Sequence, residues 1–177
     1  MAANKSVTLS SGIYDGSKTL TVTTGYSGTV SAGAQTGTSL DSKAGTSTPA
    51  SVPDGKITII DATKAGKVTA VGGAKATTIS LSGSGGTAIA GSTGADKLFG
   101  GTGADTFVLT GTKAGGADII GDNKVANASF DSGDLISLSG ASAASLSFAD
   151  NFGKNSVVIT NKAGKGKFTV YNKNSTT

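Results

Sequence analysis

The residues with the clearest capacity for chemistry are Asp96 and Asp105, two aspartates nine positions apart, each preceded by closely spaced glycines. They belong to two consecutive nine-residue units, GSTGADKLF and GGTGADTFV, which span residues 91–108. Glycine permits tight turns in which backbone carbonyl oxygens crowd around an ion. Ca²⁺ is a hard cation that takes about six to eight oxygen ligands, including Asp carboxylates. The spacing G-G-x-G-x-D-x-U-x, with U a large apolar residue, is typical of parallel β-structure that binds Ca²⁺ in its turns.

The flanks of these two units carry weaker copies of the same pattern. Residues 82–90 keep the glycines but have Thr87 where the aspartate is expected, and Asp118 follows Gly115 and Gly116 with an insertion in the last turn. Because successive units should lie on opposite sides of the structure, a complete site combines turns about two units apart. We expect turn 100–105 to pair with turn 82–87, and turn 91–96 to pair with the segment after Val108. The candidate ligands are Gly83, Gly85, Thr87, Gly91, Thr93, Gly94, Asp96, Gly100, Thr102, Gly103, Asp105 and Asp118.

Apolar residues recur at intervals of nine to eleven positions from residue 56 onward, which predicts short strands separated by turns. The sequence therefore predicts an all-β fold, a parallel β-roll or β-solenoid over residues 56–120. Residues 1–55 are expected to form a short N-terminal β element and a loop, and residues 121–177 a C-terminal β cap with a hairpin. The expected inward anchors are Ile59, Val68, Ile79, Ile89, Leu98 and Phe107.

Composition argues against several classes of function. The chain has no His or Cys, and its charged residues are all Lys and Asp, so the usual catalytic triads and transition-metal sites cannot be built. We therefore expect no enzymatic activity. The net charge of +4 comes from scattered lysines without aromatic platforms, which does not favour a nucleic-acid partner. There is no apolar run long enough for membrane insertion, and the first residues lack the apolar segment of a secretory signal peptide.

The segment GGTGADTFVLTGTKAGGADII, followed by SGDLISLSG, resembles the end of a hemolysin-type calcium-binding repeat (RTX) region. In that family the closing segment commonly reads like GGAGADTFV…GADVITDF…DxIDLSG, and the resemblance covers roughly residues 57–171. This chain departs from the family in having only two full units, and in having Gly121-Asp122-Asn123 where the family usually has Asp-Phe. The resemblance implies bound Ca²⁺, folding in the presence of extracellular Ca²⁺, and secretion, often by a type I system. Whether Asp122, Asp131 and Asp134 complete a site or only stabilise the loop of the cap stays open.

Two hypotheses about function follow. The first is a secreted structural protein, a self-assembling subunit of an extracellular fibre, surface layer or matrix in which Ca²⁺ rigidifies the roll. Such a subunit would form a homo-oligomer or polymer by strand addition. The second is a non-catalytic module of a larger secreted RTX protein that stabilises it or contacts a cell surface or polysaccharide. For the motif itself, the alternative interpretation is that its glycine-rich turns bind no metal.

Overall fold

The computed structural model of the chain describes residues 7–9, 12–16, 18–37, 39–40, 50–91, 94–110, 117–121, 130–163 and 166–172. Within these ranges the protein is nearly all β, with two short 3-10 turns and no α-helix. The predicted all-β class is therefore confirmed. The strands are β1 (Val7–Leu9), β2 (Gly12–Tyr14), β3 (Thr19–Val22), β4 (Gly28–Ser31), β5 (Gln35–Gly37), β6 (Ser39–Leu40), β7 (Ala50–Val52), β8 (Ile59–Asp61), β9 (Val68–Val71), β10 (Thr78–Ser80), β11 (Gly86–Ile89), β12 (Lys97–Phe99), β13 (Asp105–Thr110), β14 (Ala117–Ile120), β15 (Leu135–Ser139), β16 (Leu146–Asn151), β17 (Ser156–Asn161) and β18 (Gly166–Tyr171), with η1 (Ala143–Ser145) and η2 (Phe152–Lys154).

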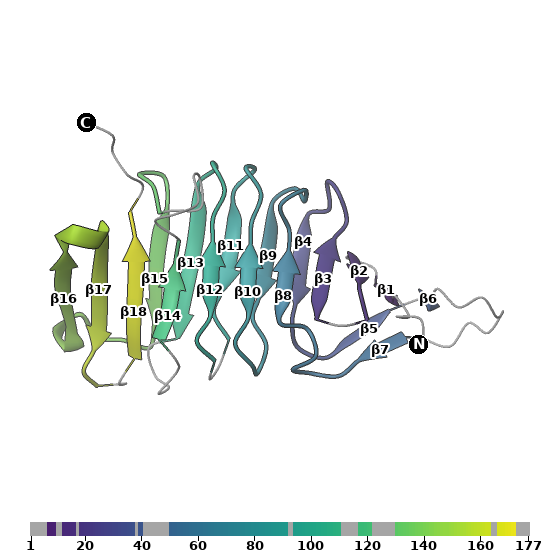
Figure 1. Ribbon diagram of the computed structural model, residues 1–177, viewed down its shortest axis with the longest axis horizontal. Coiled ribbons are helices and arrows are strands. Elements are labelled where there is room, and N and C mark those ends of the chain that lie inside the picture. The colour runs from purple at the N-terminus through teal and green to yellow at the C-terminus, as the bar shows by residue number, and fades with distance from the viewer. Residues whose placement is uncertain are drawn as a thin grey trace.

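Two sheets make up most of the molecule, one in front of the other in Figure 1. Sheet A has the strand order β16-β17-β18-β14-β12-β10-β8-β3-β2-β1-β6, and sheet B has the order β15-β13-β11-β9-β4. A small antiparallel pair, β5 and β7, stands apart from both.

The chain passes alternately between the two sheets from β8 to β15, and each strand pairs in parallel with the strand one full coil earlier. Ile79 pairs with Ile60 in sheet A, and Ala88 pairs with Ala70 in sheet B. From β8 to β13 one coil therefore takes 18 or 19 residues and contributes one short strand to each sheet, whereas the steps from β12 to β14 and from β13 to β15 take 22 and 29 residues. This pairing makes the middle of both sheets parallel, as the repeat spacing predicted.

The interior is built from two rows of side chains that cross the coils. In sheet A the in-register row is aliphatic, and in sheet B it is small in the middle coils and larger toward the C-terminal end. Small Ala side chains opposite Ile side chains let the two sheets lie close together. The sheet A row is Leu20, Ile60, Ile79, Leu98, Ile120 and Val170, and the sheet B row is Val30, Ala70, Ala88, Phe107 and Ile136.

Four of the six expected anchors are buried, namely Val68, Ile79, Leu98 and Phe107. The other two expectations were wrong, because Ile59 and Ile89 lie on the outer faces and are only partly buried. Their neighbours Ile60 and Ala88 are fully buried instead. Alternate side chains of a strand point to opposite faces, so a shift of one residue exchanges inside for outside.

The parallel pairing extends beyond residues 56–120 in both directions. Toward the N-terminus, β3 pairs with β8 and β4 pairs with β9, both in parallel, so an additional coil lies within residues 1–55. Toward the C-terminus, β17 and β18 form the antiparallel hairpin that the sequence indicated. That hairpin joins the main sheet, because β18 pairs in parallel with β14.

Candidate metal-binding turns

The connections between the sheets gather along two edges of the molecule. Turns from sheet A to sheet B, such as 81–85 and 100–104, form the first turn edge. Turns from sheet B to sheet A, such as 72–77 and 90–96, form the second turn edge. The two nine-residue units therefore place their turns on opposite edges, as the sequence analysis expected.

Neighbouring turns on each edge lie so close that glycine is required at the contact. A Cβ on Gly103 would collide with the backbone nitrogen of Gly85, and a Cβ on Gly94 would collide with the backbone of Ala76. Turn 100–104 therefore stacks on turn 82–85, as expected. Gly91 and Gly94 likewise lie against residues 73–76, which belong to a turn that carries no copy of the repeat motif.

Asp96 lies at the start of β12 with its carboxylate directed inward and 0% of the residue exposed. Oδ1 accepts a hydrogen bond from the N–H of Thr77 at 2.7 Å, and Oδ2 accepts one from the N–H of Gly91. The backbone N–H of Asp96 donates to Oδ1 of Asp118 at 2.9 Å. Asp96 thus connects its own turn to the preceding coil, and Asp118 connects the next coil to Asp96.

Asp105 has the equivalent place at the start of β13, and it is 1% exposed. Oδ2 accepts a hydrogen bond from the N–H of Gly101 at 2.9 Å, and the backbone N–H of Asp105 donates to Oδ1 of Asp134 at 2.9 Å. Its other oxygen, Oδ1, is buried and has no hydrogen-bond partner among the described residues. The N–H of Gly86 favours the charged form of the Asp105 carboxyl group and lowers its pKa, without forming a hydrogen bond to Oδ1.

Burial makes these carboxyl groups reluctant to ionise. It raises the pKa of Asp105 to about 6; the N–H of Gly101 opposes this shift, and the charge of Asp134 adds to it. Burial also raises the pKa of Asp118 to about 6, against the hydrogen bond from Asp96 and with the charge of Asp96 as a further cause. The pKa values of Asp96 and Asp134 are raised for the same first reason. A nearby cation would favour the charged forms of all four groups.

The chemistry of the donors fits a hard cation, although carboxylates alone do not complete a site. In the described ranges no group of three acidic side chains is placed to hold one metal ion. Carbonyl oxygens of the glycine turns would have to supply further ligands, as they do in many Ca²⁺ sites. The orphaned Oδ1 of Asp105 is an acceptor that such an ion would satisfy.

The predicted ligands fall into distinct places in the structure. Gly83, Gly85, Gly100, Thr102, Gly103 and Asp105 lie along the first turn edge, and Gly91, Gly94, Asp96 and Asp118 lie along the second. Thr87 does not join them, because it lies on the outer face of β11 and Gly86 is the residue in register with Asp105. Thr93 and Asp122 lie outside the described residues.

Asp134 and Thr77 are the site residues that the motif did not identify. The sequence alone does not decide the role of Asp134, and in the structure its carboxylate accepts hydrogen bonds from the N–H groups of Asp105 and Asp131. The signal for both residues is position. Thr77 directly precedes β10, which pairs with β12, and Asp134 directly precedes β15, which pairs with β13.

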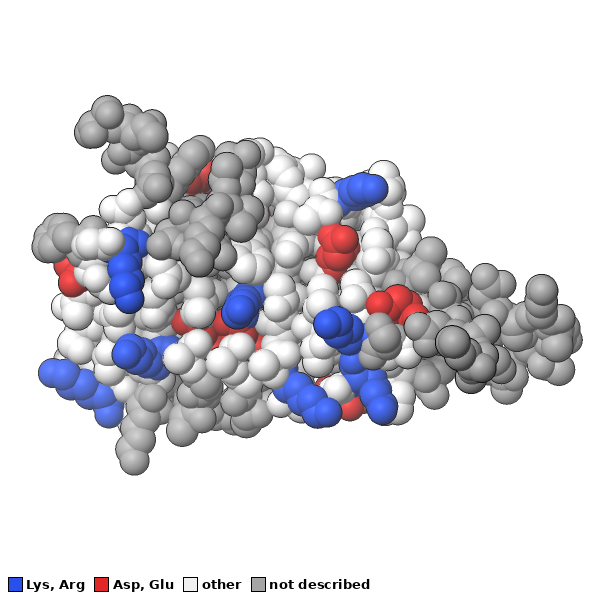
Figure 2. All heavy atoms as spheres, viewed as in Figure 1, with Lys and Arg blue, Asp and Glu red and all other residues white. Residues whose placement is uncertain are grey.

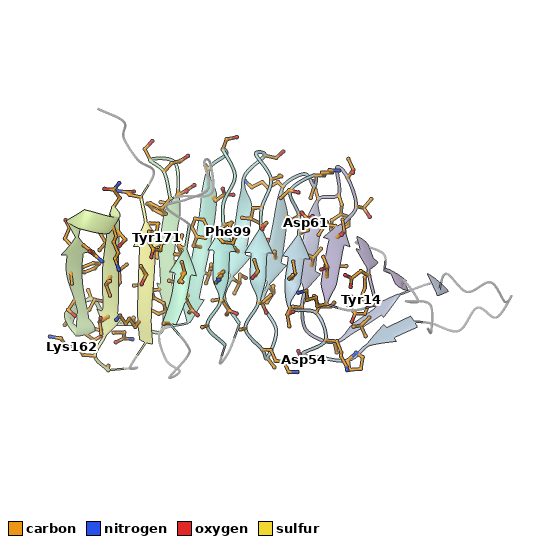
Figure 3. All side chains as sticks on the ribbon, viewed as in Figure 1. Tyr14, Asp54, Asp61, Phe99, Lys162 and Tyr171 are labelled. Atoms are coloured by element: carbon orange, nitrogen blue, oxygen red, sulfur yellow. The ribbon has the colours of Figure 1, made fainter. Side chains whose placement is uncertain are left out.

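Other aspartates act locally. Asp15 accepts hydrogen bonds from the N–H groups of Lys18 and Thr19, and Asp61 accepts them from the N–H and hydroxyl of Thr63. Figure 3 shows Asp61 at the end of β8 and Asp54 in the turn that precedes β8. Asp15 and Asp61 therefore cap turns.

Comparison with protein-family models, with curated proteins and with solved structures finds no match. None of the helices in the described part of the chain is long and apolar enough to cross a membrane. The resemblance to RTX repeats therefore rests on the residue pattern itself.

Proposed function

We propose that the protein is a secreted calcium-binding structural protein of the RTX type, whose two sheets and stacked turns form a β-roll. The observation that carries the proposal is the pair of glycine turns that end in buried, inward-facing Asp96 and Asp105. Buried carboxylates with raised pKa values disfavour the folded state at neutral pH unless a positive charge compensates them. Bound Ca²⁺ would supply that charge and hold adjacent coils together.

The residues that would hold the ion on the first turn edge are Asp105 and the stacked turns 82–85 and 100–104. On the second turn edge they are Asp96, Asp118 and the turn that begins at Gly91. A divalent ion would neutralise the repulsion within the pairs Asp96–Asp118 and Asp105–Asp134. Because it would bind only the folded chain, it would stabilise that chain by mass action, by several kcal/mol where its concentration greatly exceeds Kd.

We further propose that the protein acts outside the cell, with type I secretion as the route, and that it self-associates into a fibre, surface layer or matrix. Within the described strands, β15 is paired only with β13, and β16 only with β17. Free sheet edges are templates for pairing with another chain. The absence of His and Cys from the sequence supports a structural role over a catalytic one.

Calcium binding is tested by calorimetric titration. We expect the wild-type protein to bind Ca²⁺ and the double variant Asp96→Ala, Asp105→Ala to lose the response, because both turn edges lose their inward carboxylate. Asp61→Asn is the matched control, since Asp61 caps a turn at the end of β8 and lies outside the two carboxylate pairs. Circular dichroism checks that each variant folds. Normal Ca²⁺ binding by the double variant would show that the turns are not the site.

A second candidate function is a polysaccharide-binding or adhesin module, and the outer face of sheet B favours it. That face carries a row of threonines in register and, beside it, a row that is mainly aliphatic, with no charged side chain among the described residues. The rows are Thr29, Thr69, Thr87 and Thr106, and Ser31, Val71, Ile89 and Val108. The outer face of sheet A differs, because Asp61, Lys97 and Lys167 lie on it, and Figure 2 shows acidic and basic side chains across this side of the molecule.

Electron microscopy of the purified protein with and without Ca²⁺ separates the two functions. A structural subunit should form ordered assemblies that depend on Ca²⁺. Discrete particles under all conditions would exclude the fibre or layer and favour the module. Sedimentation with an insoluble polysaccharide then serves as the second measurement.

A further inference from the structure

The two sheets end unevenly at the C-terminal end of the molecule. Sheet B stops at β15, whereas sheet A continues past β14 through β18 to β17 and β16. Figure 1 shows β17 and β16 as the outermost strands at the left, beyond β15. These two strands, residues 146–151 and 156–161, form an overhang with no described strand of sheet B opposite them.

The inner side of this overhang carries a row of apolar side chains that becomes more exposed toward the edge, and Asp150 and Asn161 lie on the same face. Phe168, Ile159 and Phe148 are in register across β18, β17 and β16, so their side chains lie on the same face. Their exposed fractions are 1%, 6% and 66%. Phe148 is one of two large hydrophobic side chains that are exposed in the described part of the chain. A soluble protein rarely leaves the inner face of a sheet uncovered in this way.

The directions of the strands restrict what can cover Phe148. Connections from sheet A to sheet B lie on the first turn edge, and connections from sheet B to sheet A lie on the second. The parallel strands of sheet A therefore run in the opposite direction to those of sheet B. β16 runs in the same direction as β18 and β14, since both β16 and β18 are antiparallel to β17. A copy of β16 placed beside β15 would therefore meet it as an antiparallel partner.

We propose that the overhang is a dimerisation surface for a second copy of this chain. A two-fold axis parallel to the strands keeps strand direction and exchanges the two layers. This axis places β16 of the second copy beside β15 of the first copy, and β17 of the second copy beyond that β16. The two strands then lie opposite β17 and β16 of the first copy, where sheet B has no described strand. The same operation places β16 beside the second copy's β15, and the inner face around Phe148 packs on the second copy's overhang.

This surface rests on the self-association part of the proposed function and not on calcium. The same patch is used by both copies, so this contact by itself closes at the dimer, and growth of a fibre or layer would need a further contact elsewhere on the molecule. An interface of two short strands falls at the low end of the size range for specific complexes, so we expect a weak dimer whose population depends on protein concentration.

Sedimentation velocity from low to high micromolar protein tests the dimer, in chelator and in Ca²⁺-containing buffer. Wild-type protein should shift from monomer to dimer with concentration, and Phe148→Lys should weaken the dimer at least tenfold. Phe148→Leu keeps an apolar side chain and should retain the dimer. Leu135→Lys is the matched control, because Leu135 is equally exposed at 66% but lies on the outer face of β15, in register with Thr106. Thermal unfolding confirms that each variant is folded.

A wild-type protein that stays monomeric throughout, a Phe148→Lys variant that dimerises normally, or open-ended oligomers in chelator would each overturn the proposal. Failure of this dimer is distinguishable from failure of the proposed function. A monomer that binds Ca²⁺ and assembles with it excludes only the dimer surface. A dimer that shows no response to Ca²⁺ excludes only the calcium-binding role.

Discussion

At the scale of single residues, the notable groups are aspartates that the fold buries at the starts of strands. Asp96 and Asp105 each accept backbone N–H groups that would otherwise be unsatisfied where a turn enters a strand. The backbone N–H of each also donates a hydrogen bond to the carboxylate of an aspartate in the next coil, Asp118 for Asp96 and Asp134 for Asp105. The same side chains therefore fasten the turns and place negative charges close together, and a bound cation would relieve the second effect.

This arrangement predicts how stability depends on pH without calcium. The folded pKa values of Asp105 and Asp118 are about 6, against an ordinary value of 3.8, so between these values the folded chain binds more protons than the unfolded chain. The free energy of unfolding should therefore fall as pH rises from about 4 to 6, by up to about 3 kcal/mol for each carboxyl group. Urea unfolding in chelator on both sides of that window measures it.

Asp105→Asn should reduce this pH dependence, because the amide does not ionise. Added Ca²⁺ should raise stability most above pH 6, where the carboxylates are charged. Stability that rises with pH through this window in chelator would contradict the assigned protonation of the buried pairs.

At the scale of elements, the turns depend on glycine because they stack in contact with one another. Gly94 faces the backbone of Ala76 in the preceding coil. A methyl group there would push adjacent turns apart. Gly94→Ala should lower the free energy of unfolding by about 1–3 kcal/mol or more. Gly153→Ala is the control, because a Cβ at Gly153 has no other atom within 4 Å. Its effect should stay within about 0.5 kcal/mol.

Denaturant unfolding of both variants under the same conditions measures how much each substitution lowers the free energy of unfolding. Equal costs would mean that the close stacking of turn 91–96 on turn 72–77 does not limit stability. Because Gly94 also lies on the second turn edge, its replacement should weaken Ca²⁺ binding as well, whereas Gly153→Ala should not.

At the scale of the whole molecule, the coils contact mainly their neighbours, and the two ends differ. Parallel pairing runs from β3 to β18 in sheet A and from β4 to β15 in sheet B, and antiparallel strands extend sheet A beyond both ends of its parallel part. Sheet B has no such extension among the described strands. This mismatch leaves Phe148 exposed and makes the C-terminal end self-complementary.

The repeat spacing by itself indicated the local period, the all-β class and three of the four buried aspartates, Asp96, Asp105 and Asp118. The conformational freedom of glycine and the short side chain of Asp act within a few residues, so their effects can be predicted from the sequence without the tertiary structure. The C-terminal hairpin of β17 and β18 was expected from the resemblance of the tail to the cap of RTX proteins.

Only the tertiary structure decided which face of each strand lies inside and which backbone groups meet each carboxylate. Ile59 and Ile60 are consecutive and equally apolar, and the pairing of Ile60 with Ile79 settles which one is buried. Thr77, Gly86 and Asp134 become neighbours of the motif aspartates only when coils stack, at sequence separations that the motif does not encode. The register between coils depends on contacts 18 or more residues apart, and local sequence preferences do not specify such contacts.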